Sequence, residues 1–317
     1  MMPNPALAKQ WSTEFLAHSR VALDDLCAWV PERESSEVVF LVGSIPNGLA
    51  TPASDVNLLV VGERRRSGDT GRTISPEGAL AVKIKYYNTA DVERIVDKMT
   101  TTTNLILKPA DLIKLEAMTV ETLNYPEIAL LHDIRTGVPL ANSPAAARWV
   151  EVARGLPVFM ILFNVGLYTS RREDTVSQIQ AGDALAALAC ACSMVDLLAA
   201  AWLATAGESN PDPKWRVTLL RRHANEIGRR RVDKLIDHLL LPGGPDTMAR
   251  VKRALAFCDR VLARVFLRRP GLIPLMLEFR NRVKYVTHPD ERPIVRWLQN
   301  KFFTIWMRVD RLVGSQS

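Results

Sequence analysis

The stretch LVGSIPNGLATPASDVNLLVV, residues 41–61, combines side chains that hold phosphate groups and divalent cations. An apolar run ends at Gly43, where the missing side chain lets the backbone approach a phosphate, and Ser44 adds a hydroxyl and an amide as donors. Asp55 then opens a second apolar run. A carboxylate two residues further along a strand would lie on the same face and share metal ions with Asp55. The residue at that position is Asn57.

Short strands are expected to position these residues. Residues 38–42 and 56–61 are β-branched or apolar runs that flank a Gly/Pro loop, which predicts two strands. Residues 79–87, ALAVKIKYY, alternate apolar with polar or small side chains, which predicts a half-buried third strand. Lys83 and Lys85 would then lie on its polar face.

The rest of the chain is predicted to be mainly helical. Helical periodicity is expected at about 5–30 and 90–99 and from Pro109, an exposed loop at 63–76, and a strand at 128–132 that ends in a turn at Gly137. Beyond residue 145 apolar residues recur at helical spacing, in segments near 156–171, 176–206, 213–224, 229–241, 246–268, 272–287 and 291–313. The predicted fold is α+β, with a small mixed-sheet domain at residues 1–144 and an all-α helical bundle domain at residues 145–317.

The composition is that of a globular chain with an excess of basic residues. The 317 residues are 48% hydrophobic and 24% charged, which is enough for two cores, and the net charge is +7. Arginine clusters favour polyphosphate ligands, RNA or acidic partner proteins, or else they are solvated helix faces. They lie at residues 64–66, 171–172, 221–222, 229–231 and 268–269.

Residues 184–206 are long and apolar enough to cross a bilayer. Asp196 lies in the middle, where a charge costs about 2.5 to 3.5 kcal/mol, so a buried bundle helix and no membrane partner are expected. Such a carboxylate should face a ligand or pair with an arginine, which makes Asp196 a candidate substrate contact. The N-terminal residues do not have the pattern of a signal peptide, and the cysteines show no metal-ligand spacing, so a cytoplasmic protein with reduced thiols is expected.

The spacing of Gly43, Ser44 and Asp55 resembles that of the nucleotidyltransferase superfamily of the DNA polymerase β type. Within it, the block at 42–61 is most similar to the streptomycin/spectinomycin adenylyltransferases and related antibiotic-modifying enzymes. LLHDIRTGVPLANSP at 130–144 resembles the strand and turn that close the sheet in these enzymes. Residues 194–222 are similar to the helical bundle that follows, including its Lys-Trp pair.

That resemblance implies a nucleoside triphosphate at Gly43 and Ser44, with Mg²⁺ ions held by paired carboxylates. It also implies a small-molecule ligand in a cleft between the two domains, where Lys214 would contact the cofactor and Trp215 the substrate. The alternative for Trp215 is packing within the bundle.

Two departures from the family pattern bear on activity. Asn57 offers an amide oxygen but no charge, and hard cations depend on charge for affinity. The strand expected to carry the third carboxylate offers Ala81, Lys83 and Lys85 instead. Mg²⁺ binding at Asp55 is therefore predicted to be weak or absent. The lysines either take over part of the work of the metal, by pairing with Asp55 or a ligand phosphate, or cover the solvent face of an edge strand.

Other ionisable residues have both a functional and a structural interpretation. His132 and Asp133 are either an acid/base pair or turn formers. His223 either meets a phosphate or lies at an exposed helix tip, and His288 either acts as a base or caps a loop. Asp183 is expected to face the cleft or to pair with an arginine.

Three functions remain open at this stage. The first is a diverged enzyme, of the resistance or secondary-metabolite type, that acts on a small molecule in the interdomain cleft with metal-dependent nucleotidyl transfer weakened or lost. The second is a non-catalytic pseudoenzyme that binds a nucleotide, RNA or an acidic carrier protein. The third, intact Mg²⁺-dependent transfer, requires Glu77, Asp133 or Asp183 to fold near Asp55.

Overall fold

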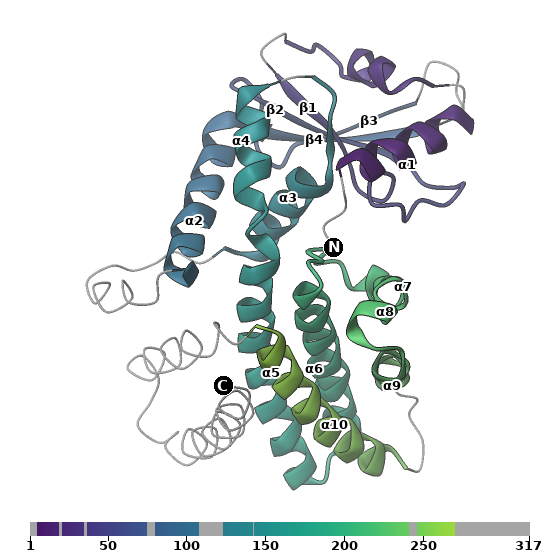
Figure 1. Cartoon of the computed structure of the whole chain (residues 1–317), viewed down its shortest axis with the longest axis vertical. Coiled ribbons are helices and arrows are strands. Elements are labelled where there is room, and N and C mark those ends of the chain that lie inside the picture. The colour runs from purple at the N-terminus through teal and green to yellow at the C-terminus, as the bar shows by residue number, and fades with distance from the viewer. Residues whose placement is uncertain are drawn as a thin grey trace, which may run out of the picture. The chain divides into compact units, whose positions relative to one another are not determined.

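A computed structural model describes residues 5–18, 21–34, 37–74, 80–107, 123–141, 143–240 and 246–269. These residues divide into two compact units. The first holds the described residues up to Leu105, residues 123–159 and Ala206–Asp212, and the second holds residues 106–107, Met160–Thr205 and the described residues from Pro213 onward. A mixed sheet is followed along the chain by helices, which confirms the α+β prediction (Figure 1). The boundary expected after residue 144 lies earlier in the chain than this division.

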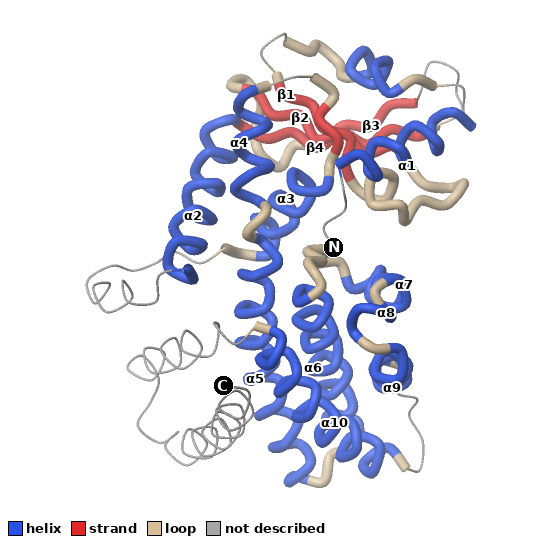
Figure 2. The backbone as a smooth tube through the Cα atoms, viewed as in Figure 1, coloured by secondary structure: helices blue, strands red, loops and turns tan. Residues whose placement is uncertain are grey.

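The described part of the first unit contains a five-stranded sheet of order β3-β4-β2-β1-β5. Figure 2 shows strands of this sheet in red. Its strands are β1 (Val38–Val42), β2 (Val56–Gly62), β3 (Thr70–Ile74), β4 (Ala81–Asn88) and β5 (Val138–Pro139). β2 and β4 are parallel, and the other neighbouring strands are antiparallel. The predicted strands at 38–42, 56–61 and 79–87 correspond to β1, β2 and β4.

Side-chain alternation gives the sheet two different faces. One face is apolar and forms a core with Leu16 of helix α1 (Pro5–His18) and Leu26 of the 3-10 helix η1 (Leu23–Trp29). On that face, Leu58 of β2 pairs with Ile84 of β4. The other face holds buried apolar residues of β1 and β2, such as Phe40 and Leu59, together with the exposed lysines of β4, so alternation places these lysines away from the first core. The segment expected at 5–30 as one periodic run is two elements, α1 and η1.

Three helices gather beside the sheet in the first unit: α2 (Thr89–Leu107), α3 (Tyr125–Thr136) and α4 (Pro144–Ala153) (Figure 1). Lys98 of α2 pairs with Glu127 of α3 at 3.0 Å. The indole nitrogen of Trp149 on α4 donates to Glu93 of α2 at 2.9 Å. These contacts link the three helices and fix the orientation of α3.

The strand predicted at 128–132 is wrong, because this segment belongs to α3. Asn124 accepts a hydrogen bond from the amide of Glu127 at 3.0 Å, and Glu127 accepts one from the amide of Asn124 at 2.9 Å. This reciprocal capping box, with Pro126 in the first turn, starts a helix. Nearly every residue from Ile128 onward in α3 is buried, including His132 and Asp133, so the sequence shows a short apolar run followed by polar residues rather than a helical stripe.

The exposed loop predicted at 63–76 is partly wrong, because it contains strand β3. β3 pairs antiparallel with β4, and its side chains are exposed or half-buried, so it has no apolar pattern to reveal it. With β3 outside it, β4 is not an edge strand. The interpretation of Lys83 and Lys85 as the solvent cover of an edge strand is therefore wrong.

The second unit is helical throughout its described residues. Its elements are α5 (Leu156–Ala181), which begins in the first unit, α6 (Ala184–Thr205), η3 (Pro213–Trp215), α7 (Arg216–Arg222), α8 (Ala224–Ile227), α9 (Arg229–Leu239) and α10 (Thr247–Arg268). Arg172 of α5 binds Asp259 of α10 through two nitrogens, at 2.8 and 3.0 Å. α10 also packs along α6, where Val251 joins a core with Ala187 and Ala191. The helices expected from Pro109, at 272–287 and at 291–313 lie outside the described residues.

Helix α6 is long and apolar enough to cross a membrane, and it is the one single helix among the described residues that meets this test. In the structure 44% of this stretch is buried.

Candidate functional site

The turn after β1 is built around Gly43. Its φ of +80° lies in the left-handed region, and a Cβ atom there would come within 3.2 Å of the Asn57 amide nitrogen. Asn47 donates to the carbonyl of Gly43 at 2.7 Å and to the hydroxyl of Thr136 at 3.2 Å. The carbonyl of Ser44 accepts from the amide of Leu49 at 2.9 Å. The turn is thus fixed in a conformation that favours glycine.

Asp55 lies immediately before β2 and forms an ion pair with Lys83 of β4. The parallel pairing of the two strands places Lys83 opposite Asn57, two residues beyond Asp55 and on the same face. The lysine side chain is 47% exposed and the aspartate side chain 29%. The structure therefore brings together Asp55, Asn57 and Lys83, all of which the sequence marked as candidates.

Asn57 directs its amide nitrogen toward the protein backbone. This nitrogen donates to the carbonyl of Asp55 at 3.1 Å. Asn57 also pairs with Val42 of β1, so it lies beside the Gly43 turn. Asn57, at the position where the family resemblance would place a second carboxylate, thereby lies between the turn after β1 and the start of β2.

Lys85 continues the same face of β4 and pairs with Asp133 of α3 at 3.0 Å. Asp133 is 8% exposed, whereas the lysine side chain is 48% exposed. Burial works against the ammonium form, but the attraction of Asp133 and the hydrogen bond that Lys85 donates to it outweigh burial and raise the pKa of Lys85 above its ordinary value. Lys85 is therefore a stable cation at neutral pH.

The role of Asp133 was only partly visible in the sequence. It was considered as a turn former or as one member of an acid/base pair with His132, on the assumption of a strand. In α3, Asp133 lies against the sheet, and its partner is Lys85. The signal that identifies the helix is the capping box at Asn124 and Glu127.

His132 points away from solvent and is 5% exposed. Its Nδ1 lies 2.8 Å from the hydroxyl of Ser209, which also accepts a hydrogen bond from Arg135 at 2.7 Å. Arg135 also donates to the carbonyl of Gly207 at 2.8 Å. Burial lowers the pKa of His132 below its ordinary value, and the nearby cations Arg135 and Lys85 act in the same direction. This geometry is that of a neutral packing histidine that anchors residues 206–212.

The remaining cofactor and substrate candidates lie in the second unit. Asp196 pairs with the buried guanidinium of Arg216 at 2.8 Å, which agrees with the expected arginine partner. The Lys214 ammonium lies 5.4 Å from the centre of the Trp215 ring. The roles of Asp196, Lys214 and Trp215 toward a ligand remain predictions.

Three other expectations have different outcomes. Asp183 accepts hydrogen bonds from the amides of Leu185 and Ala186, at 3.1 and 2.9 Å, so it caps α6. The exposed helix tip expected for His223 is wrong, because this residue is 8% exposed. Glu77 and His288 lie outside the described residues.

The donor set around Asp55 does not fit a pair of Mg²⁺ ions. Asp55 is the one acid of the motif, and its carboxylate is paired with an ammonium group. Across the described part of the chain, no three His, Cys, Asp or Glu side chains are grouped so that they could hold a metal ion. Divalent cations need several charged oxygen ligands, and an adjacent lysine repels them. Weak or absent Mg²⁺ binding stays a prediction.

The site instead presents two half-exposed ammonium groups on one face of β4. Residues two apart on a strand lie about 7 Å from each other, so Lys83 and Lys85 are neighbours. An ammonium group has three donors, and a single carboxylate contact leaves others for a ligand oxygen. Together with the Gly43 turn, this arrangement suits the recognition of a phosphate-bearing ligand.

No protein-family model matches the chain, and a search of curated proteins finds no match. Among solved structures, the chain is similar to a nucleotidyltransferase-like protein from Exiguobacterium sibiricum 255-15. The two share 15% sequence identity with a TM-score of 0.44, over 83% of this chain and 78% of the other. At that level of likeness, the function has to be argued from the residues of the site.

Proposed function

We propose that this chain is a diverged nucleotidyltransferase-fold protein that binds a nucleotide or a similar phosphate-bearing small molecule, with Mg²⁺-dependent nucleotidyl transfer weakened or lost. The ion pair between Lys83 and Asp55 is the observation that carries the proposal. It places a protein cation at the acid that would otherwise hold a metal ion. Asn57, in place of a second acid, supports the same conclusion.

The lysines would bind the phosphates directly. A surface ion pair between partly exposed groups contributes about 0 to 1 kcal/mol, so Lys83 can exchange part of its contact with Asp55 for a ligand at small cost. Charge-assisted hydrogen bonds to phosphate oxygens are stronger than neutral ones. Lys85 adds a second cation whose position is fixed by the buried Asp133.

The turn after β1 would supply the backbone part of the site. Gly43 presents no side chain toward a ligand, and the hydroxyl and amide of Ser44 can donate to phosphate oxygens. Because Asn47 holds the carbonyl of Gly43, the turn needs little reorganisation when a ligand binds.

The resemblance to antibiotic adenylyltransferases supports a small-molecule substrate of the resistance or secondary-metabolite type. In that proposal Asp196, Lys214 and Trp215 contribute contacts to the ligand. A non-catalytic binding protein is the second candidate, and the replacement of acids by Asn57 and paired lysines favours it equally. The two differ in turnover, because only an enzyme converts a nucleotide in the presence of its acceptor.

A thermal-shift panel with ATP, GTP and CTP, each with and without Mg²⁺, tests the proposal. We expect at least one nucleotide to raise the melting temperature without Mg²⁺. The double variant Lys83→Gln with Lys85→Gln should lose this response. Lys9→Gln, a matched change of an exposed lysine on α1, should keep it.

Three results would overturn the proposal: no stabilisation by any nucleotide without Mg²⁺, an unchanged response in the double lysine variant, or stabilisation that depends strictly on Mg²⁺. The last result, together with release of pyrophosphate, would establish intact nucleotidyl transfer instead. Pyrophosphate release that is independent of Mg²⁺ would distinguish a diverged enzyme from a binding protein.

A further inference from the structure

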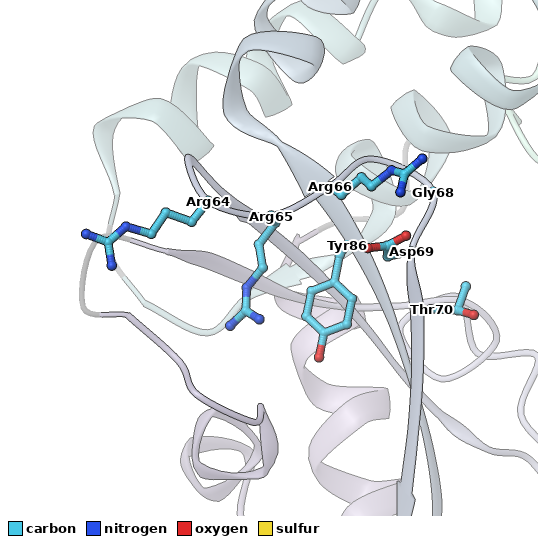
Figure 3. Close-up of a pocket in the computed structure, with 7 residues that line it drawn as sticks. All are labelled: Arg64, Arg65, Arg66, Gly68, Asp69, Thr70 and Tyr86. Atoms are coloured by element: carbon cyan, nitrogen blue, oxygen red, sulfur yellow. The ribbon is translucent and has the colours of Figure 1, made fainter.

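A second cluster of cations lies at the other end of β2. The loop at residues 63–69 joins β2 to β3 and carries three consecutive arginines. Together with residues of β3 and β4, the loop lines a cavity of about 600 Å³ (Figure 3). The lining residues are Arg64, Arg65, Arg66, Gly68, Asp69, Thr70 and Tyr86.

Hydrogen bonds to β4 and to the side chain of its last residue, Asn88, hold the loop in place. The amide of Gly68 donates to the carbonyl of Tyr86 at 3.1 Å, and the amide of Tyr86 donates to the carbonyl of Asp69 at 2.9 Å. The Asn88 side chain donates to the carbonyl of Glu63 at 2.7 Å. Bonds at both ends of a short loop fix its backbone, so its side chains project from a defined frame.

The central arginine has a structural role. The guanidinium of Arg65 donates to the carbonyls of Pro31 and Glu32, at 3.1 and 3.0 Å. It also pairs with Glu37, whose side chain is 1% exposed, and lies 4.7 Å from the centre of the Tyr86 ring. Because a buried carboxylate needs a partner, the guanidinium of Arg65 is used in contacts within the protein. It also keeps Tyr86 in position.

The flanking arginines, Arg64 and Arg66, do not have such a network of contacts within the protein. The Arg64 side chain is 84% exposed and makes one surface ion pair, with Glu34 at 3.1 Å. No side chain in the described part of the chain pairs with Arg66, which is exposed. In Figure 3 the two side chains extend to either side of the stacked Arg65 and Tyr86. Two guanidinium groups are therefore available to a ligand from a rigid loop.

We propose that this cavity binds a phosphate monoester of a polyhydroxylated small molecule, such as a mononucleotide or a sugar phosphate. Arg64 and Arg66 lie on opposite sides of Arg65, and their exposed side chains turn toward one another to bind its phosphate, because the planar fork of a guanidinium matches the oxygens of a phosphate. The volume lies within the usual range for small-molecule sites, about 300 to 1,000 Å³. Asp69 repels a second phosphate and accepts hydrogen bonds from hydroxyl groups, and Thr70 offers a further hydroxyl.

This cavity is separate from the candidate site at Asp55. Asp55 precedes the first residue of β2 and the arginine loop follows its last, so the length of the strand, about 20 Å, lies between them. The two sites also use different faces of β4, because Tyr86 contacts the apolar core and the lysines do not. Binding at one site can therefore be removed without altering the other.

Isothermal titration calorimetry of the full-length chain with AMP tests the proposal, with adenosine as the probe that lacks the phosphate. We expect AMP to bind and adenosine to bind at least about tenfold more weakly, since charge-assisted contacts contribute about 1.4 kcal/mol or more. The double variant Arg64→Gln with Arg66→Gln should weaken AMP binding at least about tenfold. Arg72→Gln, an exposed arginine of β3 outside the cavity, is the matched control and should change it less than about twofold.

Backbone amide chemical shifts locate the bound AMP. The amides of Gly68 and Thr70 should move on titration in the wild-type chain and stay in place in the double arginine variant. The proposal is overturned by the absence of AMP binding, by equal affinity for adenosine, or by a double variant that binds as the wild type does. It is also overturned if Arg72→Gln weakens binding as much, or if only the amides of Gly43 and Ser44 respond.

Discussion

Replacing Lys83 by glutamine removes the ammonium group that pairs with Asp55, and this change should let the carboxylate bind a divalent cation more tightly. Glutamine is one atom shorter than lysine, but it is polar, uncharged and still able to donate hydrogen bonds. The perturbation is therefore mainly one of charge. The expected result is a measurable gain in Mg²⁺ or Mn²⁺ affinity at a site where the wild-type chain binds weakly.

The size of the gain follows from the geometry of the ion pair. A divalent ion on the Asp55 carboxylate would lie roughly 5 Å from the lysine nitrogen, where the two charges repel by about 1.7 kcal/mol at the dielectric constant of water. The water-like limit applies because the two side chains are 47% and 29% exposed. Salt screening lowers the repulsion to about 1 kcal/mol, which corresponds to an affinity gain of about fivefold.

Two further variants sharpen this test. Adding Asn57→Asp supplies a second carboxylate on the same face, and the double variant should bind Mn²⁺ at least about tenfold more tightly than Lys83→Gln alone. Lys85→Gln is the matched control, because its charge lies about 7 Å further along β4 and its partner is Asp133. Its effect should be smaller than that of Lys83→Gln.

Electron paramagnetic resonance of Mn²⁺ at an ionic strength of about 0.1 M, the condition assumed for the screening, measures free ion and gives the dissociation constants. Equal Mn²⁺ affinity in the wild type and in Lys83→Gln would refute the idea that the lysine occupies the role of a cation. An equal gain in Lys85→Gln would show a general field effect rather than a specific pairing with Asp55.

Three further predictions concern the frame around the site. The folded chain keeps His132 neutral, whereas the unfolded chain binds a proton below about pH 6.5, so the free energy of unfolding should fall by up to about 1.4 kcal/mol as pH falls from about 7.5 to about 5.5. Urea titrations should show this slope, and His132→Gln should reduce it. Gly43→Ala should destabilise the chain by about 1 to 2 kcal/mol in the same assay, because φ is +80° and the new methyl group would meet Asn57. Cys258 is fully buried and burial raises the pKa of its thiol, so a thiol reagent should modify it only after unfolding, as mass spectrometry can show.

Each of these has a clear contrary outcome. A pH dependence that is the same in His132→Gln and in the wild type would assign the acid sensitivity to other groups. A Gly43→Ala chain as stable as the wild type would mean that the turn relaxes without strain. Modification of Cys258 in the native state, at a rate that does not depend on denaturant, would contradict its burial.

Local signals in the sequence were sufficient to predict the strands that position the candidate site. The apolar runs at 38–42 and 56–61, the Gly-Ser turn between them and the alternation in ALAVKIKYY predict β1, β2 and β4, because each signal depends on residues that are adjacent in the chain. The sequence also shows the missing acid at Asn57. The sequence did not predict α3, where burial on all sides removes the periodic pattern. It did not predict β3 either, where exposure removes the pattern.

Only the tertiary structure decided which charges meet. The parallel register of β2 and β4 brings Lys83 to Asp55, and the packing of α3 brings Asp133 to Lys85. Likewise, the sequence shows three arginines at 64–66, but only the fold reveals that Arg65 forms an ion pair with Glu37. Strand register and helix packing arise from contacts between residues far apart in the chain, which no local pattern encodes. The sequence therefore determined which chemical groups this protein has, and the fold determined which of them neutralise each other and which remain available to a ligand.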